Sequence, residues 1–317
     1  SPPPSSPRPS PPPPPSPPPS PPSPPSPPFG CEACSTAADL EVALSSQVAC
    51  INLAATTFKL SETLSIGYGV TINGGASLVG GYIHGGAKLD MQHYAKTVVD
   101  IFAENERVVL HGLHIINGGN SGVYVRSGSV TMNTVNISHN IGFYGGGVTV
   151  DADGDVDFIQ CQLSNNVATP LGGGVFAGGT VRFSGCLIYD NYASLGGSGV
   201  AVVQSTATFT DTRISGNSGD PNQFQSGVYI SGDPANSPSE HSKRFINSDI
   251  FSNSGYQVYV EGVSDHSVCY YPITFSGIIG TIVFCPPDTV PSGYCFLQLN
   301  QNNIGGACAP RDTPPAY

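Results

Sequence analysis

One acidic segment of this chain has residue types and spacing that could carry chemistry. Asp151, Asp153 and Asp155 alternate with Ala152 and Gly154. Carboxylate oxygens are hard ligands of the kind that Ca²⁺ takes. The segment lacks the distal bidentate glutamate of an EF-hand loop, so a polar Asp-Gly corner is the alternative to a calcium site. Calcium is the cofactor that this segment suggests, and we expect no other.

Other polar residues do not form a catalytic pattern. His111 and His114 are three residues apart, which places them on opposite faces of a strand and makes them a poor metal pair. Asp157 and Arg182 occupy equivalent positions in neighbouring repeats, and we interpret them as a surface ion pair rather than a catalytic dyad. We therefore predict no enzymatic activity and assign no catalytic residue.

The elements that position these residues are sequence repeats. The segment from Val130 to Asn140 aligns with four later segments, and Val108 to Gly118 is a degenerate earlier copy. The five segments end on Asn140, Asn166, Asn191, Asn217 and Asn253, and the first four of these are 26, 25 and 26 residues apart. Glycine clusters lie between them, as in Gly145 to Val148 and Gly172 to Val175. A fixed period in this range is typical of a solenoid.

Each repeat reads as short strands joined by corners. Val156, Phe158, Cys161 and Leu163 should point inward and Gln162 outward, with a bend where the alternation breaks after Phe158. Stacked copies would bury a continuous core and pair each strand with the coils on either side. The corner asparagines should adopt the left-handed backbone conformation and bond through their side-chain amides to the next coil. The predicted fold is all-β, a right-handed parallel β-helix.

A short helix should close the N-terminal end of this solenoid. Ser35 or Thr36 can cap it, and Leu40, Ala43 and Leu44 would form its buried side. Without such a cover, the first coil would expose unpaired strand edges.

We expect three parts: a Ser/Pro-rich arm over residues 1–30, the β-helix with its N-terminal cap over 31–262, and an irregular C-terminal cap over 263–317, where the period fails. Residues 76–103 are less regular and should hold two imperfect coils. Asp220 to Ser242 should be an insertion at one corner, because Asn217 and Asn253 are 36 residues apart.

Nine cysteines indicate an oxidising, extracellular compartment. Cys161 and Cys186 fall in one inward column and should be stacked free thiols, because neighbouring ladder positions suit a disulfide poorly. Cys50 should pair with Cys31 or Cys34, which leaves the other one free or intermolecular. The last four should form two bridges within the C-terminal cap: Cys269, Cys285, Cys295 and Cys308.

The first 28 residues consist of 19 Pro, 8 Ser and one Arg. Proline fixes φ and removes the backbone donor, so this arm should form polyproline II and extend roughly 90 Å. Roughly nine coils at ~4.8 Å span only ~43 Å, so most of the arm would reach beyond its own domain. We predict that the arm joins identical subunits into a fibre, held in grooves lined by Tyr and other apolar side chains.

The repeats carry a family resemblance. The Leu/Ile-x-x-Asn corners, such as Leu163 to Asn166 and Ile188 to Asn191, and the Gly-Gly-Gly-Val runs resemble those of polymorphic outer-membrane-type β-helix proteins, and more broadly the pectin-lyase-like superfamily. The resemblance covers roughly Cys50 to Gly262, with Leu or Ile where Phe is usual. It implies the fold alone, because this superfamily includes lyases, hydrolases, adhesins and structural proteins. The short motifs of polygalacturonase-like members (Asn-Thr-Asp, Asp-Asp, Gly-His-Gly, Arg-Ile-Lys) do not occur in this sequence.

The arm resembles the extensin-like, hydroxyproline-rich glycoproteins of green algal and plant walls, with an unmodified stiff linker as the alternative. The resemblance implies hydroxylation and O-glycosylation of Pro2, Pro3, Pro4, Pro11, Pro12, Pro13, Pro14, Pro15, Pro17, Pro18 and Pro19. Asn136 belongs to the single Asn-x-Ser/Thr sequon of the chain and should alternate outward, which suits N-glycosylation.

Composition limits the partners. Charged residues make up only 10% of the chain and the net charge is −11, which argues against nucleic acid as a partner. No run of 18 apolar residues occurs, so we expect no membrane span. Ser1 lies within the proline run and no leader precedes it, which we interpret as a processed or truncated chain.

These observations together predict a secreted structural glycoprotein of a cell wall or surface appendage. Its partners would be identical subunits in a fibre and wall or surface glycans. The alternatives are a carbohydrate-active enzyme of the pectin-lyase-like superfamily and a glycan-binding adhesin that uses outward tyrosines such as Tyr124 and Tyr144. A cleft with several convergent carboxylates would favour the enzyme, and a flat face with exposed aromatic side chains would favour the adhesin.

Overall fold

In the computed structural model the chain divides into two compact units, Ser1–Gly30 and Cys31–Tyr317. The structure describes residues 30–92, 95–223, 225–231 and 243–261, and the backbone of residues 273–276, 282–285 and 298–299. The predicted polyproline arm and the cysteines Cys269, Cys295 and Cys308 lie outside the described residues, as does the side chain of Cys285.

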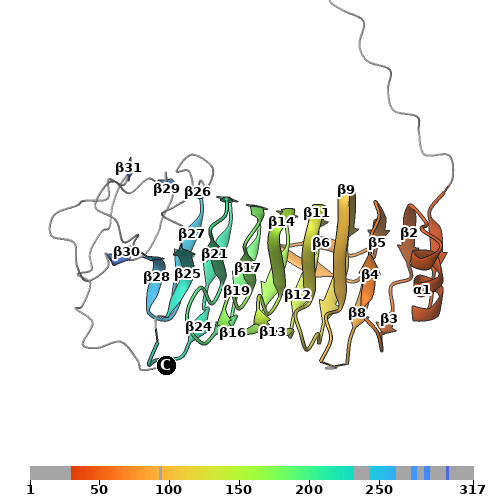
Figure 1. Ribbon diagram of the computed structural model, residues 1–317, viewed down its shortest axis with the longest axis horizontal. Coiled ribbons are helices and arrows are strands. Elements are labelled where there is room, and N and C mark those ends of the chain that lie inside the picture. The colour runs from red at the N-terminus through yellow and green to blue at the C-terminus, as the bar shows by residue number, and fades with distance from the viewer. Residues whose placement is uncertain are drawn as a thin grey trace, which may run out of the picture. The chain divides into compact units, whose positions relative to one another are not determined.

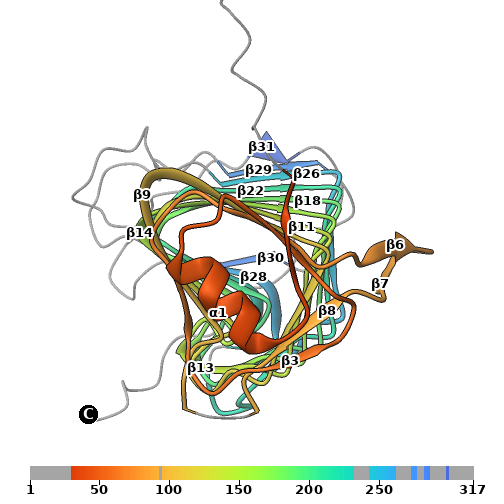
Figure 2. The ribbon, with the colours of Figure 1, turned by 90° about the vertical axis from the view of Figure 1, so that its right-hand side faces the viewer.

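The second unit is a parallel β-helix, seen from the side in Figure 1 and along its axis in Figure 2. Each coil passes through successive rows of strands, and each strand pairs in parallel with its equivalents in the neighbouring coils. Three long strands bend between the first and second rows: β9 (Val99–His111), β11 (Val123–Asn133) and β14 (Val148–Ile159). The predicted fold class is therefore confirmed.

Rows one and two form a 17-stranded sheet. Besides the long strands, row one contains β4 (Leu64–Ile66), β17 (Val175–Ala177), β21 (Val200–Val203), β25 (Ser226–Ser231), β28 (Tyr256–Glu261) and β30 (Ile282–Cys285). Row two contains β1 (Glu32–Cys34), β2 (Cys50–Leu53), β5 (Thr71–Asn73), β18 (Thr180–Ser184), β22 (Ala207–Thr210), β26 (Lys243–Ile246), β29 (Ile273–Ser276) and β31 (Gln298–Leu299).

Row three is an eight-stranded sheet, and a short four-stranded sheet completes the coils in the middle of the solenoid. Row three contains β3 (Thr57–Lys59), β8 (Ala87–Asp90), β10 (Leu113–Ile116), β12 (Asn136–Ser138), β15 (Gln162–Ser164), β19 (Leu187–Tyr189), β23 (Arg213–Ser215) and β27 (Asp249–Phe251). The short sheet contains β13 (Ile141–Tyr144), β16 (Val167–Leu171), β20 (Tyr192–Ala193) and β24 (Ser218–Gly219).

The core consists of identical side chains stacked from coil to coil. Phe158, Phe183, Phe209 and Phe245 are fully buried, with successive ring centroids 4.6, 4.9 and 4.5 Å apart and rings within 6° of parallel. Burying one such side chain contributes about 1.5–3 kcal/mol. The inward positions predicted for the repeat that begins at Val156 are all buried, which confirms the alternation and the bend.

The corner asparagines form a buried ladder along the solenoid. The Oδ1 atom of Asn166 accepts hydrogen bonds from the backbone N–H and the Nδ2 of Asn140, each 3.0 Å long, and Asn191 does the same for Asn166. The prediction of side-chain bonds between coils is confirmed. The expected left-handed conformation is wrong for these residues, because it falls one residue earlier, on His139, Asn165, Asp190, Gly216 and Ser252. That preceding residue turns the chain, so that the asparagine side chain points into the core.

The glycine clusters bring the backbones of adjacent coils into close contact. A Cβ atom on Gly174 would lie 2.5 Å from the carbonyl oxygen of Gly199, and one on Gly147 would meet Gly174 at the same distance. Glycine is therefore required in these clusters because the backbones of adjacent coils lie too close for a side chain. It is also required for the turn at Gly172, whose φ is +76°.

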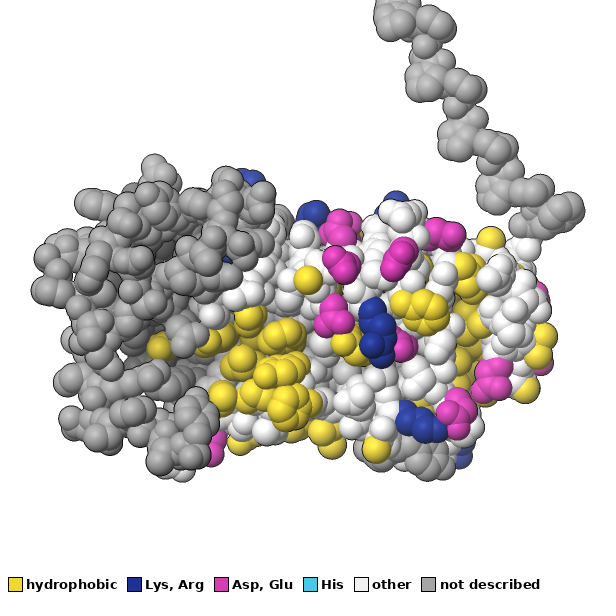
Figure 3. All heavy atoms as spheres, in the orientation of Figure 1, with side chains coloured by type: hydrophobic (Ala, Val, Ile, Leu, Met, Phe, Trp, Pro, Cys, Tyr) yellow, Lys and Arg dark blue, Asp and Glu magenta, His cyan; other side chains and the backbone are white. Residues whose placement is uncertain are grey.

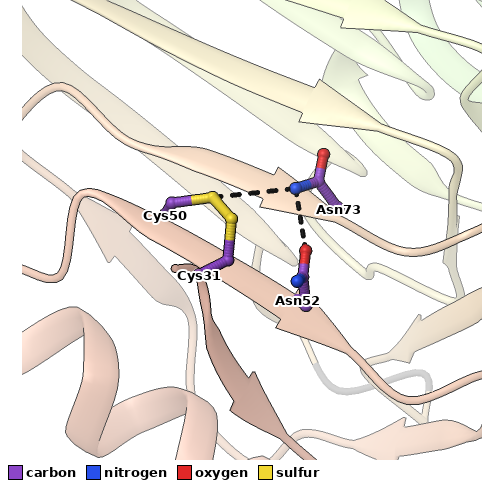
Figure 4. Close-up of a disulfide and its surroundings, with 4 residues drawn as sticks. All are labelled: Cys31, Cys50, Asn52 and Asn73. Carbon is purple, nitrogen blue, oxygen red and sulfur yellow. Dashed lines mark hydrogen bonds between the residues drawn. A yellow bond between two sulfur atoms is a disulfide. The ribbon is translucent and has the colours of Figure 1, made fainter. Parts of the chain in front are cut away.

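Helix α1 (Ala37–Ser45) covers the first coil, as predicted (Figure 2). Thr36 is its N-cap and forms a capping box with Asp39, and Leu40, Ala43 and Leu44 are buried. A disulfide joins Cys31 to Cys50, one of the two pairings that the sequence allowed. Figure 4 shows this bond beside Asn73, whose Nδ2 donates to Asn52 at 2.9 Å.

Two regions differ from the expected repeat. Residues 76–103 do not form two coils: they contain β8, the start of β9, and an antiparallel hairpin of β6 (Ser77–Val79) and β7 (Tyr82–His84) that projects from the solenoid in Figure 2. The hairpin is framed by Gly74-Gly75 and Gly85-Gly86 and turns at Gly80-Gly81, all positions where glycine avoids steric cost.

The expected insertion and the expected end of the repeat are also corrected. Strand β25 lies within the segment from Asp220 to Ser242 and pairs in register with β21, so this part of the segment is a regular row-one strand. Parallel pairing continues beyond Gly262, because β29 pairs with β26 and β30 pairs with β28. The stacking of strands continues there although the sequence repeat does not.

Candidate functional site

A shallow cleft of about 550 Å³ lies at the bend between rows one and two. It is lined by Glu104, Asn105, Glu106, Arg107, Ser127, Gly128, Ser129, Asp153 and Asp155. It exists because four residues of β9, Ala103 to Glu106, bulge out opposite Gly128 of β11, where the register shifts. A Cβ atom on Gly128 would lie 2.2 Å from the carbonyl oxygen of Ala103, so this bulge depends on glycine.

Two of the four carboxylates in this cleft are already engaged. Glu106 accepts a hydrogen bond from the backbone N–H of Gly69 in the preceding coil. Asp155 pairs with Arg182 at 2.5 Å, and the same guanidinium reaches Asp157 at 3.2 Å. These groups are substantially exposed, so their ion pairs contribute little to stability. Asp157 and Arg182 are neighbours in register, as predicted from the repeat.

The predicted calcium ligands do not converge. Asp151 accepts a hydrogen bond from the Tyr124 hydroxyl at 2.7 Å, Asp155 pairs with Arg182, and Asp153 lines the cleft. Within the described part of the chain, no group of three or more His, Cys, Asp or Glu side chains is arranged to hold a metal ion. Calcium stays a prediction from the sequence, without a ligand set among these residues.

An aromatic column runs along the outer face of row one. Five outward residues stand in register on successive coils: Tyr124, Thr149, Phe176, Ala201 and Tyr229. The aromatic residues are half-buried, whereas Thr149 and Ala201 are buried between them. Large and small side chains therefore alternate along these five coils, and the small ones are covered by the backbone of the glycine corners, Thr149 by Gly145 and Ala201 by Gly197.

Strand β13 adds exposed apolar side chains beside this aromatic column. Phe143 is 64% exposed, Ile141 51% and Tyr144 39%. The Tyr144 ring lies 4.7 Å from that of Phe176, and the Phe143 ring packs edge-on against Tyr144 at 4.8 Å. Figure 3 shows hydrophobic side chains gathered over this part of the solenoid. Contiguous exposed apolar surface of this kind marks an interaction site more often than a scattered one does.

The aromatic column ends in a charged network at Tyr124. Arg126 pairs with Asp100 at 2.8 Å, and its guanidinium lies 4.3 Å from the centre of the Tyr124 ring. Burial, together with the hydrogen bond to Asp151, raises the pKa of the Tyr124 hydroxyl. Asp100 pairs with the guanidinium and Asp151 accepts from the Tyr124 hydroxyl, so two carboxylates and one guanidinium leave a net negative charge at this end of the column.

The hairpin β6–β7 lies over the predicted N-glycosylation site. Asn136 faces outward in β12 but is half-buried, and its Oδ1 atom is buried without a hydrogen-bond partner. Its register neighbours are bonded to the hairpin segment: His114 to the carbonyl oxygen of Gly85 at 2.6 Å, and Gln162 to that of Gly81 at 2.8 Å. Gln162 points outward as predicted, yet it is buried because the hairpin covers it. A glycan on Asn136 requires the hairpin to be displaced.

The described cysteines outside the disulfide are buried free thiols: Cys34, Cys161 and Cys186. The prediction for Cys161 and Cys186 is confirmed. The Cys161 thiol donates to the carbonyl oxygen of Met132 at 3.2 Å, and burial raises its pKa well above the ordinary value. These thiols are structural, because a reactive cysteine needs exposure and a stabilised thiolate.

Among the described residues, one charged residue lies in the core. Lys243 of β26 is in register with Ala207 and fully buried, and burial lowers its pKa to about 8. The repeat alignment placed it at an inward position, and the sequence analysis did not single it out. No helix among the described residues has the length and apolarity needed to cross a membrane.

With the coils in view, the comparison with known families is direct. Residues 99–270, more than half of the chain, match the family described as the right-handed beta helix region. The chain belongs to this family. A search of curated proteins and a search of solved structures each gave no match.

Sequence reasoning missed the bend cleft and the alternation of the aromatic column. Tyr124 and Tyr144 had been singled out as outward tyrosines, but Phe176, Phe143 and the small residues between them had not. The register of the repeats could have revealed the column, because Tyr124, Phe176 and Tyr229 follow the glycine clusters at equivalent positions. Glu104 and Glu106 lie on a bulge that no repeat predicts.

Proposed function

We propose that this protein is a structural subunit of an extracellular wall or surface filament and has no enzymatic turnover. The β-helix is the rigid body, and the Ser/Pro-rich arm joins it to identical subunits. The observation that carries this proposal is that the repeated side chains point inward. The asparagine and phenylalanine ladders are buried and bond or stack between coils, so the repeats build a rod rather than a reaction site.

Two observations support the extracellular setting. The Cys31–Cys50 disulfide is of the kind that persists in oxidising compartments. The composition of the arm, 19 prolines in its first 28 residues, suits hydroxylation and O-glycosylation more than a plain linker. Wall or surface glycans are the second class of partner in this proposal.

A filament follows from head-to-tail contacts. An arm that docks on the body of another copy makes a heterologous contact, in which the two surfaces differ. Such contacts generate rings only when their rotation closes, and otherwise they generate open filaments. The fixed φ of proline limits the backbone entropy lost on docking, which favours such an arm as a connector.

Deleting residues 1–28 tests the proposal. The core of the described residues runs from Cys34 to Val258 and is continuous by itself, so the shortened protein should keep its far-ultraviolet circular dichroism spectrum and its thermal midpoint. Light scattering and electron microscopy should show monomers where the full chain forms fibres. Fibres of unchanged length and symmetry from the shortened protein would overturn the proposal.

A carbohydrate-active enzyme is the second candidate, because the bend cleft gathers four carboxylates and Arg107. Paired carboxylates are the usual apparatus of glycoside hydrolysis. We expect no release of unsaturated or reducing ends from pectate or polygalacturonate. Turnover that is lost in both Glu104→Gln and Asp153→Asn, while Glu62→Gln on another surface retains it, would replace the structural proposal by this one.

A further inference from the structure

The hairpin of β6 and β7, which projects from the solenoid in Figure 2, has one strand that is exposed along its whole length. In β7, Ile83 is buried and only 7% exposed. In β6 all three residues are exposed, with Val79 at 60% and Leu78 at 37%. A Cβ atom added at Gly80 or Gly81 would meet no atom beyond its chain neighbours within 4 Å, so the space around the turn is open. Strand β6 is therefore the free edge of a two-stranded sheet.

The turn determines which backbone groups this edge offers. Its two glycines have φ values of +59° and +86°, as the common two-residue hairpin turn requires. In such a hairpin Val79 and Tyr82, next to the turn, exchange both backbone hydrogen bonds, and the next pair, Leu78 and Ile83, exchanges none. The N–H and C=O of Leu78 therefore point out of the β6 edge, and they have no hydrogen-bond partner among the described residues.

This edge has none of the features that keep exposed strands from pairing. Charged side chains, proline or a bulge usually serve that purpose. The segment from Gly74 to Ala87 contains no Lys, Arg, Asp, Glu or Pro, and its two strands pair without a bulge. The fold does cover the open edge of its first coil, with helix α1. A two-stranded hairpin is also marginally stable by itself, and added strands stabilise it.

From these observations we infer that β6 pairs with β6 of a second copy, antiparallel and about a two-fold axis at Leu78. In this register the Leu78 residues of the two copies face each other, and the N–H of each donates to the C=O of the other. The edge is thus complementary to itself, as an isologous contact requires. Ser77 of each copy stands opposite Val79 of the other, and the two hairpins become one four-stranded sheet.

Charge favours a second copy at this place. The chain has a net charge of −11, so identical subunits repel one another. Because the hairpin segment has no Asp, Glu, Lys or Arg, two hairpins can approach without direct repulsion. The pairing surface of one three-residue strand lies well below the ~800 Å² per partner of a stable interface, so the contact is weak unless other contacts hold the copies together. The inference goes beyond the proposed function, because this contact does not involve the arm.

Disulfide trapping in the full chain tests the register. Two facing Leu78 residues would have Cα atoms about 5.5 Å apart, within the reach of a disulfide. The Ser77 residues of the two copies, and likewise the Val79 residues, would be ~8 Å apart and beyond that reach. In a buffer of reduced and oxidised glutathione, Leu78→Cys should form at least about fivefold more disulfide-linked dimer than Ser77→Cys or Val79→Cys. Non-reducing electrophoresis measures the dimer, and the unaltered chain gives the background from the native cysteines.

A mixture of two variants tests the same register independently. Cysteines of Ser77→Cys and Val79→Cys would stand opposite each other, with Cα atoms about 4.5 Å apart. An equal mixture should form the mixed dimer although each variant alone forms little, and mass spectrometry of the linked peptides identifies it. Both positions are exposed, so these variants should keep the circular dichroism spectrum of the unaltered chain. Equal trapping at all three positions, or no excess in Leu78→Cys and in the mixture, would overturn the inference.

A proline variant tests the backbone bonds. The N–H of Leu78 takes no part in the hairpin, so Leu78→Pro removes the outward donor and leaves the bonds of the hairpin intact. Added to both members of the mixture, Leu78→Pro should lower the yield of mixed dimer at least about fivefold. The matched control, Leu78→Ala, keeps the backbone donor and should change the yield less than about twofold. Equal yields from the two would show that the contact is not made by strand pairing.

The deletion of residues 1–28 keeps this inference distinguishable from the proposed function. Dimers trapped by Leu78→Cys in a shortened protein that no longer forms fibres would support both. Fibres from the full chain without trapping by Leu78→Cys would overturn this inference alone. Fibres that survive the deletion, with trapping unchanged, would overturn the structural proposal alone.

Discussion

Replacing Asn166 by glycine should destabilise the protein far more than replacing its neighbour Asn165 by glycine. The two asparagines are adjacent and chemically identical, but the structure gives them different roles. Asn165 is exposed and has a φ of +55°, whereas the side chain of Asn166 is fully buried in the ladder. The pair therefore separates the backbone requirement of the corner from its hydrogen bonding.

The magnitude follows from the bonds that each substitution removes. The Asn166 amide accepts two hydrogen bonds from Asn140 and donates one each to Asn191 Oδ1 and the Ile137 carbonyl oxygen, at 2.9–3.0 Å. Four buried bonds at about 1 kcal/mol each give a loss of about 4 kcal/mol. Asn165→Gly removes no described bond and relieves a strained φ, so it should change stability by less than about 0.5 kcal/mol.

Urea unfolding monitored by far-ultraviolet circular dichroism measures both variants against the unaltered chain. The midpoint should fall clearly for Asn166→Gly and stay within error for Asn165→Gly, with parallel slopes. A third variant, Asn165→Ala, should lose about 1 kcal/mol, because alanine resists the left-handed conformation. Equal midpoints for the two glycine variants, or a larger loss at Asn165, would refute the assignment of roles.

Three further predictions concern the buried ionisable and sulfur-bearing groups. Because burial lowers the Lys243 pKa to about 8 from an ordinary 10.5, the unfolded chain binds more protons between these values, and the free energy of unfolding should rise with pH there. That rise should disappear in Lys243→Met and persist in Lys88→Met, as followed by thermal midpoints from pH 7.5 to 10.5. Cys31→Ser should lower the free energy of unfolding by about 3 kcal/mol, the entropy of closing a loop of 19 residues. A loss clearly smaller than the loss caused by reducing the disulfide of the unaltered chain with dithiothreitol would contradict this. Cys161 and Cys186 should react with maleimide only after unfolding, and peptide mapping of modified native protein checks this.

The fold was largely predictable because its signal is periodic. Inward side chains such as Phe158 and Phe183 recur at a fixed spacing, and stacking requires them to do so. The capped helix at Thr36 was predictable from local chemistry. The left-handed corner was misassigned because Asn165 and Asn166 both suit it. The glycine at 216, one residue before Asn217, was the signal that distinguishes the two positions.

The misread features interrupt the period instead of repeating it. The hairpin occupies part of one coil. Its Gly80-Gly81 turn can be recognised in the sequence, but this segment was assigned to a coil of the solenoid. The bend cleft depends on the bulge from Ala103 to Glu106, a local change in residue number that has no pattern in other coils. Hydrogen bonds between distant segments, such as that from Gln162 to Gly81, could likewise not be predicted, because they depend on the tertiary structure.

The same regularity explains why a solenoid suits a repeating ligand. Backbone hydrogen bonds set the rise per coil, so any outward column presents side chains at multiples of ~4.8 Å. A ligand with no repeat meets such a column at one point, but a ligand whose repeat is close to two coils gains a contact at every second coil. In the aromatic column, Thr149 and Ala201 are buried, so the half-buried rings of Tyr124, Phe176 and Tyr229 form its accessible surface at every second coil.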